Sequence, residues 1–493
     1  MRIVEGEQAL QALLKFVTES AHQLEAHEAA NGIFTRLLPM GLAAMKLSFA
    51  QRGTGDGGPA ITRADGEMRP REKPRRGRDD CAIFGTFKVA RTGYRTPGEP
   101  GIFPLDAPVN LPERCHSSFW QEWRTVFAVE HPFQERAGCL AQLLALEVAE
   151  SVVMEGAKEA PADDEGCSAQ RPVPPEESAG EFLVGRFDGK GVPLLKEEAA
   201  KRKAKWGTGE QRQQKKEALV GVSDPVDPTP RAPEARAELL GDPEAARARR
   251  AGDHATDDAP RAPQGRRVAS LGRTKRAVMA RIKAAAERRD PQHRKPVVIL
   301  RDGALGLGRL APRLFQPGKR VPGVLDLLHV VGSLWRAANA RFGAQSRAGK
   351  RWVPQKLTES LRGRGGDVIG GLRQILTKRT LRKSAREALT QGRTCFHNHR
   401  RWMRYDAYLA AGLPVGTGVV ASACGSVVKH RREGEGKRWS LDGAEAMLAL
   451  RSLKKSHDDD LRDYWRFHAR RVRTRLYGRI PKYRPTALLR RVA

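Results

Sequence analysis

Two short apolar runs that each end in Asp-Gly constrain this sequence more than any other feature. The segment GEFLVGRFDGKGVPL places Asp188-Gly189 after the first run, and KPVVILRDGALG places Asp302-Gly303 after the second. A short apolar run bounded by turn residues is typical of a buried strand. The sequence therefore predicts an α/β domain in which two strands that end side by side deliver two carboxylates to one place.

Two carboxylates in one place suit a hard divalent cation such as Mg²⁺ or Mn²⁺, because these ions prefer oxygen ligands and keep waters for substrate phosphates. Two such ions activate the attacking oxygen and stabilise the leaving oxygen in phosphoryl transfer. An Asp-Gly pair is also an ordinary turn signal. Neither aspartate identifies a metal site alone, but the pair on a strongly basic chain predicts metal-dependent chemistry on a DNA strand.

The charge of the chain indicates its partner. The 493 residues carry a formal net charge of +32 and a pI near 10.5. Such a surplus attracts polyanions, and nucleic acid is the expected one. An anionic membrane is the alternative, but we find no apolar run near the ~18–20 residues that a transmembrane helix needs. We therefore expect DNA as the partner and no membrane.

The ends and cysteines of the chain exclude other classes. The N-terminal MRIVEGEQALQALLKF contains early glutamates and lacks the basic n-region of a secretory signal. The six cysteines are scattered singly without a CxxC pair, which argues against a zinc ribbon and a disulfide framework. A reduced cytosolic compartment fits this pattern.

Hydrophobic periodicity and breaker residues divide the rest of the chain into expected elements. We expect helices over 7–50, interrupted at Pro39, and over 117–155; a linker or basic arm over 51–80; a β-hairpin over 81–95; a strand over 217–223; a mobile insert over 224–270; a strand that becomes a helix in GVLDLLHVVGSLW; and a helix-rich basic region over 333–410.

Seven sequence blocks, in order, carry a resemblance to a known family. They are IFPLDAPVNLPE, DGKGVP, KKEALVGV, DGALGL, GVLDLLHVVGSLWRAA, YDAYLAAGLPVGTGVV and GEGKRWSLDGAEAMLALRSL. Over about residues 80 to 480 the chain resembles the transposases of the ISKra4 insertion-sequence family. The resemblance implies an RNase H-like DDE catalytic core with a helical insertion, preceded by an α/β N-terminal DNA-binding region.

The resemblance assigns the catalytic acids one by one. It implies that Asp188 is the first and Asp302 the second metal-binding aspartate. The third acid of the family lies on the helix after GLPVGTGVV, and its position here is occupied by Ala421. The cysteine of the same helix is retained as Cys424. We expect strand cleavage and strand transfer to be impaired in a site that lacks its third carboxylate.

Three further departures fall on the predicted core strands. Gly185 and Arg186 interrupt the run before Asp188, and Arg301 directly precedes Asp302. Glycines and charges on a core strand cost stability unless they are paired or lie on an edge. We interpret these residues, together with Ala421, as drift in a degenerate copy.

Other candidate residues each have two interpretations. Asp326 and His329 share a helix face and are either an accessory pair beside the metal or a histidine satisfied by its neighbour. Cys395, His397 and His399 lack a zinc-like spacing and are expected on a polar helix surface. A last group either grips DNA phosphates, with the tryptophan stacking on an unpaired base, or forms a solvated basic surface around a core tryptophan. Its members are Lys429, Arg431, Arg432, Lys437, Arg438 and Trp439.

The expected function is that of a DNA transposase acting at the terminal inverted repeats of its element and on target DNA, as a homo-oligomer in the bacterial, nucleoid-associated cytoplasm. The alternatives are a non-catalytic DNA-binding relic and an RNase H-like nuclease. The expected domains are a helical segment with a basic linker (1–80), a hairpin and helical region for DNA binding (81–178), the first part of the core (179–332) with its insert (224–270), the helical insertion (333–410), the last part of the core (411–460) and a basic tail (461–493).

Overall fold

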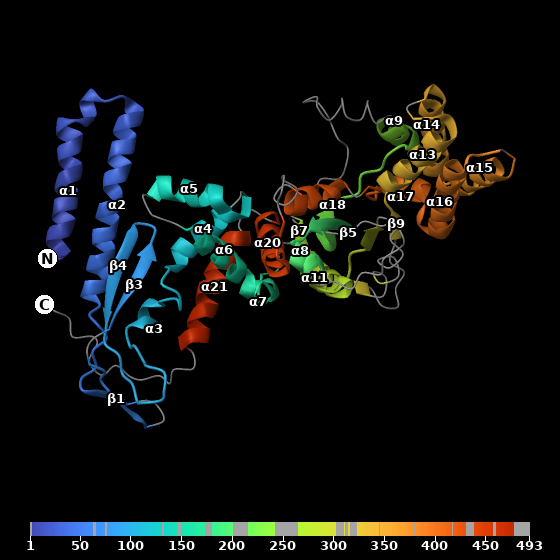
Figure 1. Ribbon diagram of the computed structural model, residues 1–493. Coiled ribbons are helices and arrows are strands. Elements are labelled where there is room, and N and C mark those ends of the chain that lie inside the picture. The colour runs from blue at the N-terminus through green and yellow to red at the C-terminus, as the bar shows by residue number, and fades with distance from the viewer. Residues whose placement is uncertain are drawn as a thin grey trace. The chain divides into compact units, whose positions relative to one another are not determined.

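The chain divides into two compact units. Unit 1 comprises residues 1–170 and 461–493, and unit 2 comprises residues 171–460. The computed structural model describes residues 2–62, 66–73, 76–130, 133–144, 149–172, 180–200, 215–241, 265–301, 310, 314–315, 323–344, 346–378, 380–416, 418–429, 438–456 and 460–477 (Figure 1).

Unit 1 consists of helices and two small antiparallel hairpins. Its elements are α1 (Arg2–Glu19), η1 (Ala21–Gln23), α2 (Ala26–Gln51), β1 (Ala60–Thr62), β2 (Met68–Pro70), β3 (Arg76–Ala82), β4 (Gly85–Arg91), α3 (Asp106–Val109), α4 (Ser118–Glu130), α5 (Phe133–Leu144), α6 (Glu150–Glu159), η2 (Ala160–Asp163), α7 (Asp164–Ala169) and α21 (Asp460–Tyr477).

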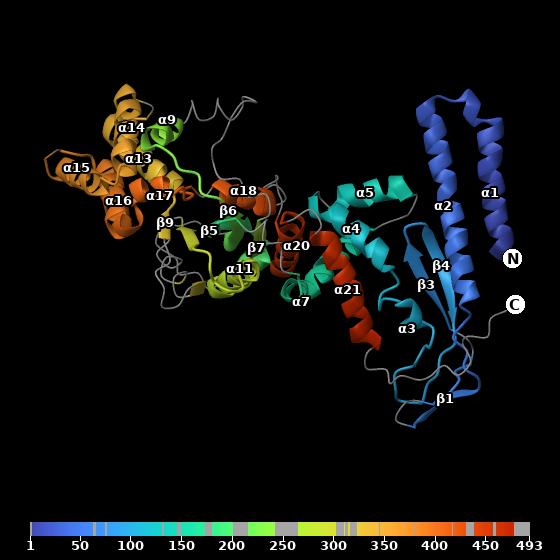
Figure 2. The ribbon, with the colours of Figure 1, turned by 180° about the vertical axis from the view of Figure 1, so that it is seen from behind.

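The first two helices form an antiparallel pair beside the β3–β4 hairpin (Figure 2). A capping box starts α2, in which the carboxylate of Glu28 accepts the backbone N–H of Glu25 at 3.2 Å. The C-terminal half of α2 packs its apolar side chains Leu42 and Phe49 against a core that contains Phe87. Burial of these side chains joins the helical pair to the hairpin.

The segment 51–80, expected to be a linker or basic arm, contains folded structure. Strands β1 and β2 pair from Ala60 opposite Pro70 to Thr62 opposite Met68. The Tyr94 hydroxyl accepts the backbone N–H of Gly57 at 2.6 Å, which ties the segment to the body of the unit. The expected hairpin is present, but β3 begins at residue 76 rather than 81. The polar strand β3 has no apolar alternation, which explains why its start was missed.

Helix α2 also corrects the expectation about membranes. By length and composition alone, it is apolar enough to cross one, and only 11% of its most apolar window is buried within the structure. The run was overlooked because Pro39 appeared to divide it, whereas the helix continues through this residue.

Unit 2 consists of a five-stranded mixed sheet and helices. Its elements are β5 (Phe182–Pro193), α8 (Lys196–Ala200), β6 (Lys215–Val226), α9 (Pro233–Gly241), β7 (Arg266–Ser270), α11 (Lys275–Arg289), β8 (Val297–Arg301), β9 (Gly323–Leu325), α13 (Leu327–Phe342), α14 (Arg347–Leu361), α15 (Gly365–Lys378), α16 (Lys383–His399), η4 (Arg400–Trp402), α17 (Tyr405–Ala410), α18 (Gly418–Ala423), a π-helical turn η5 (Cys424–Lys429) and α20 (Leu441–Lys454).

The strand order in the sheet is β7-β6-β5-β8-β9. Strands β5, β6 and β7 are antiparallel neighbours, whereas β8 and β9 run parallel to β5. This confirms the α/β class and adds a strand, β7, within the segment that was expected to be a mobile insert. Residues 242–264 of that segment lie outside the described residues.

Alternate residues of the central strands enter two separate cores, as the strand period of two requires. Leu183 and Phe187 of β5 pack with α11 on one face of the sheet. Val184 packs on the other face, in the core shared with the helices that follow β9. Helices α11 and α18 lie on opposite sides of the sheet in both views (Figures 1 and 2). The expected helix-rich region consists of α13 to α17, joined by the second core.

Candidate functional site

Asp188 lies where the parallel pairing of β5 with β8 stops. Phe187 is paired with Arg301, and these residues directly precede Asp188 and Asp302 in the sequence. Strand β5 itself continues to Pro193 and pairs Asp188 with Val220 of β6, so Asp188 is within a strand rather than at its end. The expectation of a strand-end aspartate is therefore corrected for β5. Asp302 lies outside the described residues.

The carboxylate of Asp188 contacts the backbone of the next residue and a thiol from a segment distant in sequence. Its Oδ1 accepts the backbone N–H of Gly189 at 2.8 Å. The Sγ of Cys424 lies 3.5 Å from its Oδ2, where a thiol acts as a weak donor. The aspartate is partly buried, whereas Cys424 is buried. The helical segment that contains Ala421 therefore packs beside the strand that contains Asp188.

Ala421 lies one helical turn before Cys424. Residues three apart lie near the same face of a helix, so Ala421 and Cys424 lie near one another on this segment. Its methyl group is exposed, whereas the neighbouring Ala423 is buried. A longer side chain at this position would have room without displacing the core.

A π-helical turn follows α18 and is fixed by a buried arginine. Arg451 of α20 is 1% exposed, and its Nε donates to the carbonyl oxygens of Ser426 and Val427 at 3.1 and 3.0 Å. Cations satisfy the carbonyl groups that a helix leaves free near its C-terminal end. π-helical turns are rare overall, and those that occur are often found at functional sites. Sequence reasoning missed Arg451, since nothing local marks a contact made 25 residues away.

Arg186 is paired, which corrects its interpretation as drift. Its guanidinium forms an ion pair with Asp224 of β6, and the two side chains are 1% and 0% exposed. Burial lowers the pKa of Arg186 to about 9. Arg186 shares its face of β5 with Asp188, because residues two apart on a strand point the same way. Because its charge is compensated by a buried carboxylate, Arg186 is part of the folded core and is not a sign of drift.

The other two residues interpreted as drift are also accommodated. The Arg301 guanidinium lies 3.9 Å over the ring of Trp402, a cation–π contact. Burial, followed by repulsion from Arg401, lowers the pKa of Arg301 to about 10. At Gly185, an added Cβ would lie 2.9 Å from Ile299 Cδ1, so the glycine leaves space for the core. Within the described residues, Ala421 is the departure that has no such structural reason.

Asp326 and His329 have separate surroundings. The Asp326 carboxylate caps α13 by accepting the backbone N–H of Leu328 at 3.2 Å. The Nε2 of His329 lies 3.4 Å from the Sγ of Cys395 on α16. Of the residues expected on a polar helix surface, His397 is exposed, Cys395 is half-buried and His399 is buried, so the expectation is wrong for His399. These contacts favour structural roles for Asp326 and His329.

The expected DNA-contacting residues are only partly described. Lys429 and Arg438 are exposed, and Arg431, Arg432 and Lys437 lie outside the described residues. Trp439 is 8% exposed, and its backbone N–H donates to the carbonyl of Pro193 at 3.3 Å. A ring this buried has no free face for a base. The base-stacking expectation for Trp439 therefore does not fit, and the core interpretation does.

The described residues do not by themselves complete a metal site. Among them, no group of three or more His, Cys, Asp or Glu side chains is arranged to hold an ion. Asp188 contributes one oxygen donor group, and the thiol beside it is a poor ligand for Mg²⁺, which prefers oxygen. Of the two predicted metal-binding aspartates, the described residues therefore include only Asp188.

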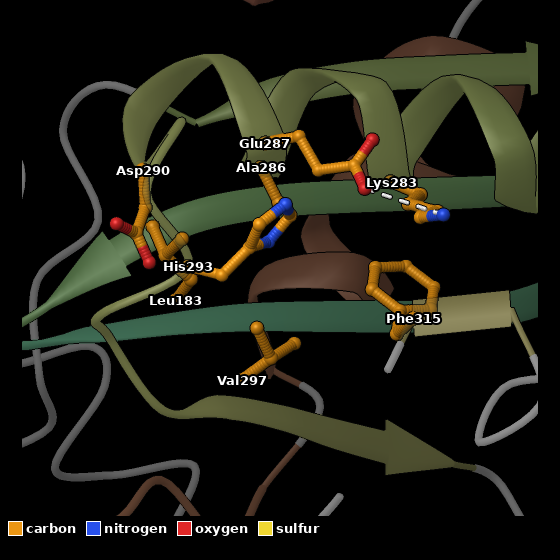
Figure 3. Close-up of a pocket in the computed structure, with 8 residues that line it drawn as sticks. All are labelled: Leu183, Lys283, Ala286, Glu287, Asp290, His293, Val297 and Phe315. Carbon is orange, nitrogen blue, oxygen red and sulfur yellow. Dashed lines mark ion pairs between the residues drawn. The ribbon is translucent and has the colours of Figure 1, made fainter. Parts of the chain in front are cut away.

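A small pocket lies at the other end of the strands (Figure 3). Its lining residues are Leu183, Lys283, Ala286, Glu287, Asp290, His293, Val297 and Phe315. Leu183 and Val297 pair at the start of β5 and β8, four residues before Phe187 and Arg301. At ~3.3 Å per residue, the pocket is roughly 13 Å from the Asp188 end of the sheet. It is therefore separate from the candidate site.

Comparisons with known proteins provide little further guidance. No protein-family model matches the chain, and no curated protein matches it. Among solved structures, the chain is similar to the Drosophila P element transposase strand transfer complex. The identity is 7% and the TM-score 0.33, over 70% of this chain and 93% of that chain. A likeness at this TM-score does not establish a shared fold.

Proposed function

We propose that the chain is a DNA transposase with an RNase H-like DDE core of the ISKra4 type, in which strand cleavage is impaired because Ala421 occupies the position of the third acid. The observation that carries the proposal is the contact between Cys424 and Asp188 at 3.5 Å. It brings the helix expected to carry the last acid against the strand expected to carry the first. The sequence separates these two residues by 236 positions.

The sheet supports the same proposal. A two-aspartate site requires the strands before the two aspartates to be neighbours with their ends together. Strands β5 and β8 are parallel neighbours, and Phe187 pairs with Arg301. In this proposal, Asp188 and Asp302 bind Mg²⁺ or Mn²⁺, which supplies activation of the attacking oxygen in phosphoryl transfer. Asp188 contributes a carboxylate, and Ala421 cannot provide the third one.

DNA is the proposed partner, in the form of element ends and target DNA, and the bacterial cytoplasm the proposed location. The net charge of +32 supports a polyanionic partner. Helix α21 adds a local observation, because it buries Tyr464 and Trp465 on one side and exposes arginines on the other. The arginines on that side are Arg462, Arg466, Arg470 and Arg473, whereas the exposed Arg471 and Arg475 pair with the carboxylate of Asp163 at 4.0 and 3.7 Å. Such a face suits contacts with phosphates, which position DNA without reading its sequence.

The test restores the missing carboxylate. We expect Ala421→Glu to cleave DNA that carries the flanking inverted repeats, in the presence of Mg²⁺ or Mn²⁺, while the natural chain does not cleave it above background. Ala421→Gln is the matched control, since it adds the same volume without the charge. The Asp188→Asn change in the Ala421→Glu background should abolish the gained cleavage.

The outcomes separate the alternatives. Cleavage by the natural chain contradicts the proposed impairment. A natural chain and an Ala421→Glu variant that both bind the repeats without cleaving them support a non-catalytic DNA-binding relic. Cleavage of an RNA–DNA hybrid without any need for terminal repeats supports an RNase H-like nuclease.

A further inference from the structure

The helical hairpin α1–α2 carries apolar side chains that the described chain leaves exposed. On α1, Leu10, Leu14 and Val17 are 43%, 54% and 43% exposed, and on α2, Phe34 and Leu37 are 39% and 44% exposed. The α1 residues are spaced by four and three, and the α2 residues by three. This is the spacing of the a and d positions that form the seam of a coiled coil.

The exposed side chains of both helices lie on one side of the hairpin. Phe16 of α1 faces α2, where the guanidinium of Arg36 lies 3.8 Å over its ring. Val17 and Leu37 each follow these facing residues by one position. One residue is a turn of about 100°. Because the helices are antiparallel, the same turn rotates both side chains toward the same side of the pair.

Two other surfaces of α2 are already used. One face packs against α1, where Lys46 pairs with Glu5 at 3.1 Å. Another packs against the β3–β4 hairpin through Leu42, Met45 and Phe49. The apolar stripe is thus a third surface, and the composition that makes α2 resemble a membrane span comes partly from side chains packed within unit 1.

The charge of the hairpin selects its partner. Residues 2–51 contain four basic and five acidic side chains, whereas the whole chain has a net charge of +32. A nearly neutral segment has no electrostatic attraction to DNA or to anionic lipid. It also lacks the basic polar face of helices that bind at membrane surfaces. Two strongly cationic chains repel one another least where each is neutral, so a second copy fits this surface.

We propose that Leu10, Leu14, Val17, Phe34 and Leu37 form a self-association surface, on which the hairpins of two copies pack stripe to stripe. A two-fold axis buries the same patch on both copies, and two helical hairpins then form a four-helix bundle. The inference deepens the homo-oligomer expected of a transposase, but it rests on the hairpin alone. Its failure would leave the cleavage experiment unaffected.

The experiment measures the mass of the full-length chain by light scattering after size exclusion, over a range of concentrations. Nuclease treatment and high salt remove nucleic acid, since salt weakens phosphate contacts. We expect twice the chain mass of 54.4 kDa for the natural chain. The Leu14→Glu/Phe34→Glu variant should elute as a 54.4 kDa monomer at the same concentration, with a dissociation constant raised by at least about tenfold.

The matched control is Gln8→Glu/Thr35→Glu, which adds the same charges to exposed positions on the opposite side of each helix. It should remain dimeric. All replaced side chains are exposed, so circular dichroism and thermal unfolding of the variants should match the natural chain. Mixing the double-glutamate variant with Leu14→Lys/Phe34→Lys should restore the doubled mass, because opposite charges then meet in the interface.

Three results would overturn the proposal. The first is a natural chain that is monomeric at every concentration tested. The second is a double-glutamate variant that stays dimeric. The third is a natural chain that floats with neutral phosphatidylcholine vesicles, with flotation lost in the double-glutamate variant, which would assign the stripe to a lipid surface.

Discussion

Replacing Asp224 by Asn tests the buried ion pair that lies beside the candidate site. The substitution keeps the shape of the side chain, removes its charge and leaves Arg186 buried without an anion. Arg186 is 1% exposed, and burial lowers its pKa only to about 9, so it remains charged at pH 7. Removing one partner of a buried ion pair costs about 3–5 kcal/mol. That is a large fraction of the ~5–15 kcal/mol by which a folded domain is stable.

The assay is urea unfolding at pH 7, followed by tryptophan fluorescence and circular dichroism. With a slope of about 2 kcal/mol per molar urea, the midpoint of the unit 2 transition should fall by roughly 1.5–2.5 M. Asp227→Asn is the matched control, because this residue is exposed just after the end of β6 and should change the midpoint little.

A double replacement separates the ion pair from simple packing. Arg186→Met/Asp224→Leu exchanges the pair for apolar groups of similar volume, a change that is often neutral or stabilising. We expect its stability to lie within about 1 kcal/mol of the natural chain. The reasoning is refuted if Asp224→Asn costs less than about 1 kcal/mol, or if the double variant is as unstable as the single one.

Two further predictions concern a turn and a histidine. Gly412 has φ of 70°, and an added Cβ would lie 2.4 Å from the backbone N of Thr229, so Gly412→Ala should cost about 2–4 kcal/mol in urea unfolding; Gly416→Ala, with nothing within 4 Å, should change stability by less than about 1 kcal/mol. Burial, followed by repulsion from Arg124 and other arginines, lowers the pKa of His116 from 6.5 to about 4. Between these pH values only the unfolded chain gains the proton, so stability should fall as the pH falls from 6.5 to 4, and His116→Gln should flatten that fall. Equal losses for the two glycine variants, or an unchanged pH dependence in His116→Gln, would contradict these arguments.

Sequence patterns predicted the main elements of unit 2 because those elements have strong local signals. The apolar runs before Asp188 and Asp302 correspond to β5 and β8, and KKEALVGV lies within β6. Strand β7 was missed, because its two arginines hide a short buried segment in which Val268 and Ala269 are 2% and 3% exposed. Strand β3 was missed in part for the same reason. Polar strands give no alternation to detect.

The sequence was less informative about charged residues inside the core. Arg186 and Arg301 violate the expectation for buried strands, and locally they resemble damage. Asp224 and Trp402, which accommodate them, lie on other elements of the fold. The sequence cannot reveal this compensation, because a strand register and a helix packing must form before the partners meet.

By itself, the sequence determined the α/β class, the cationic character and the two Asp-Gly runs, because hydrophobic period and net charge are properties of the chain alone. It also identified the helix that contains Ala421 as a candidate site element. Only the tertiary structure decided that this helix packs beside Asp188 through Cys424, that Trp439 is buried, and that α1 and α2 expose their apolar stripe on one side. Each of these depends on which residues, distant in sequence, are brought together and which faces they leave uncovered.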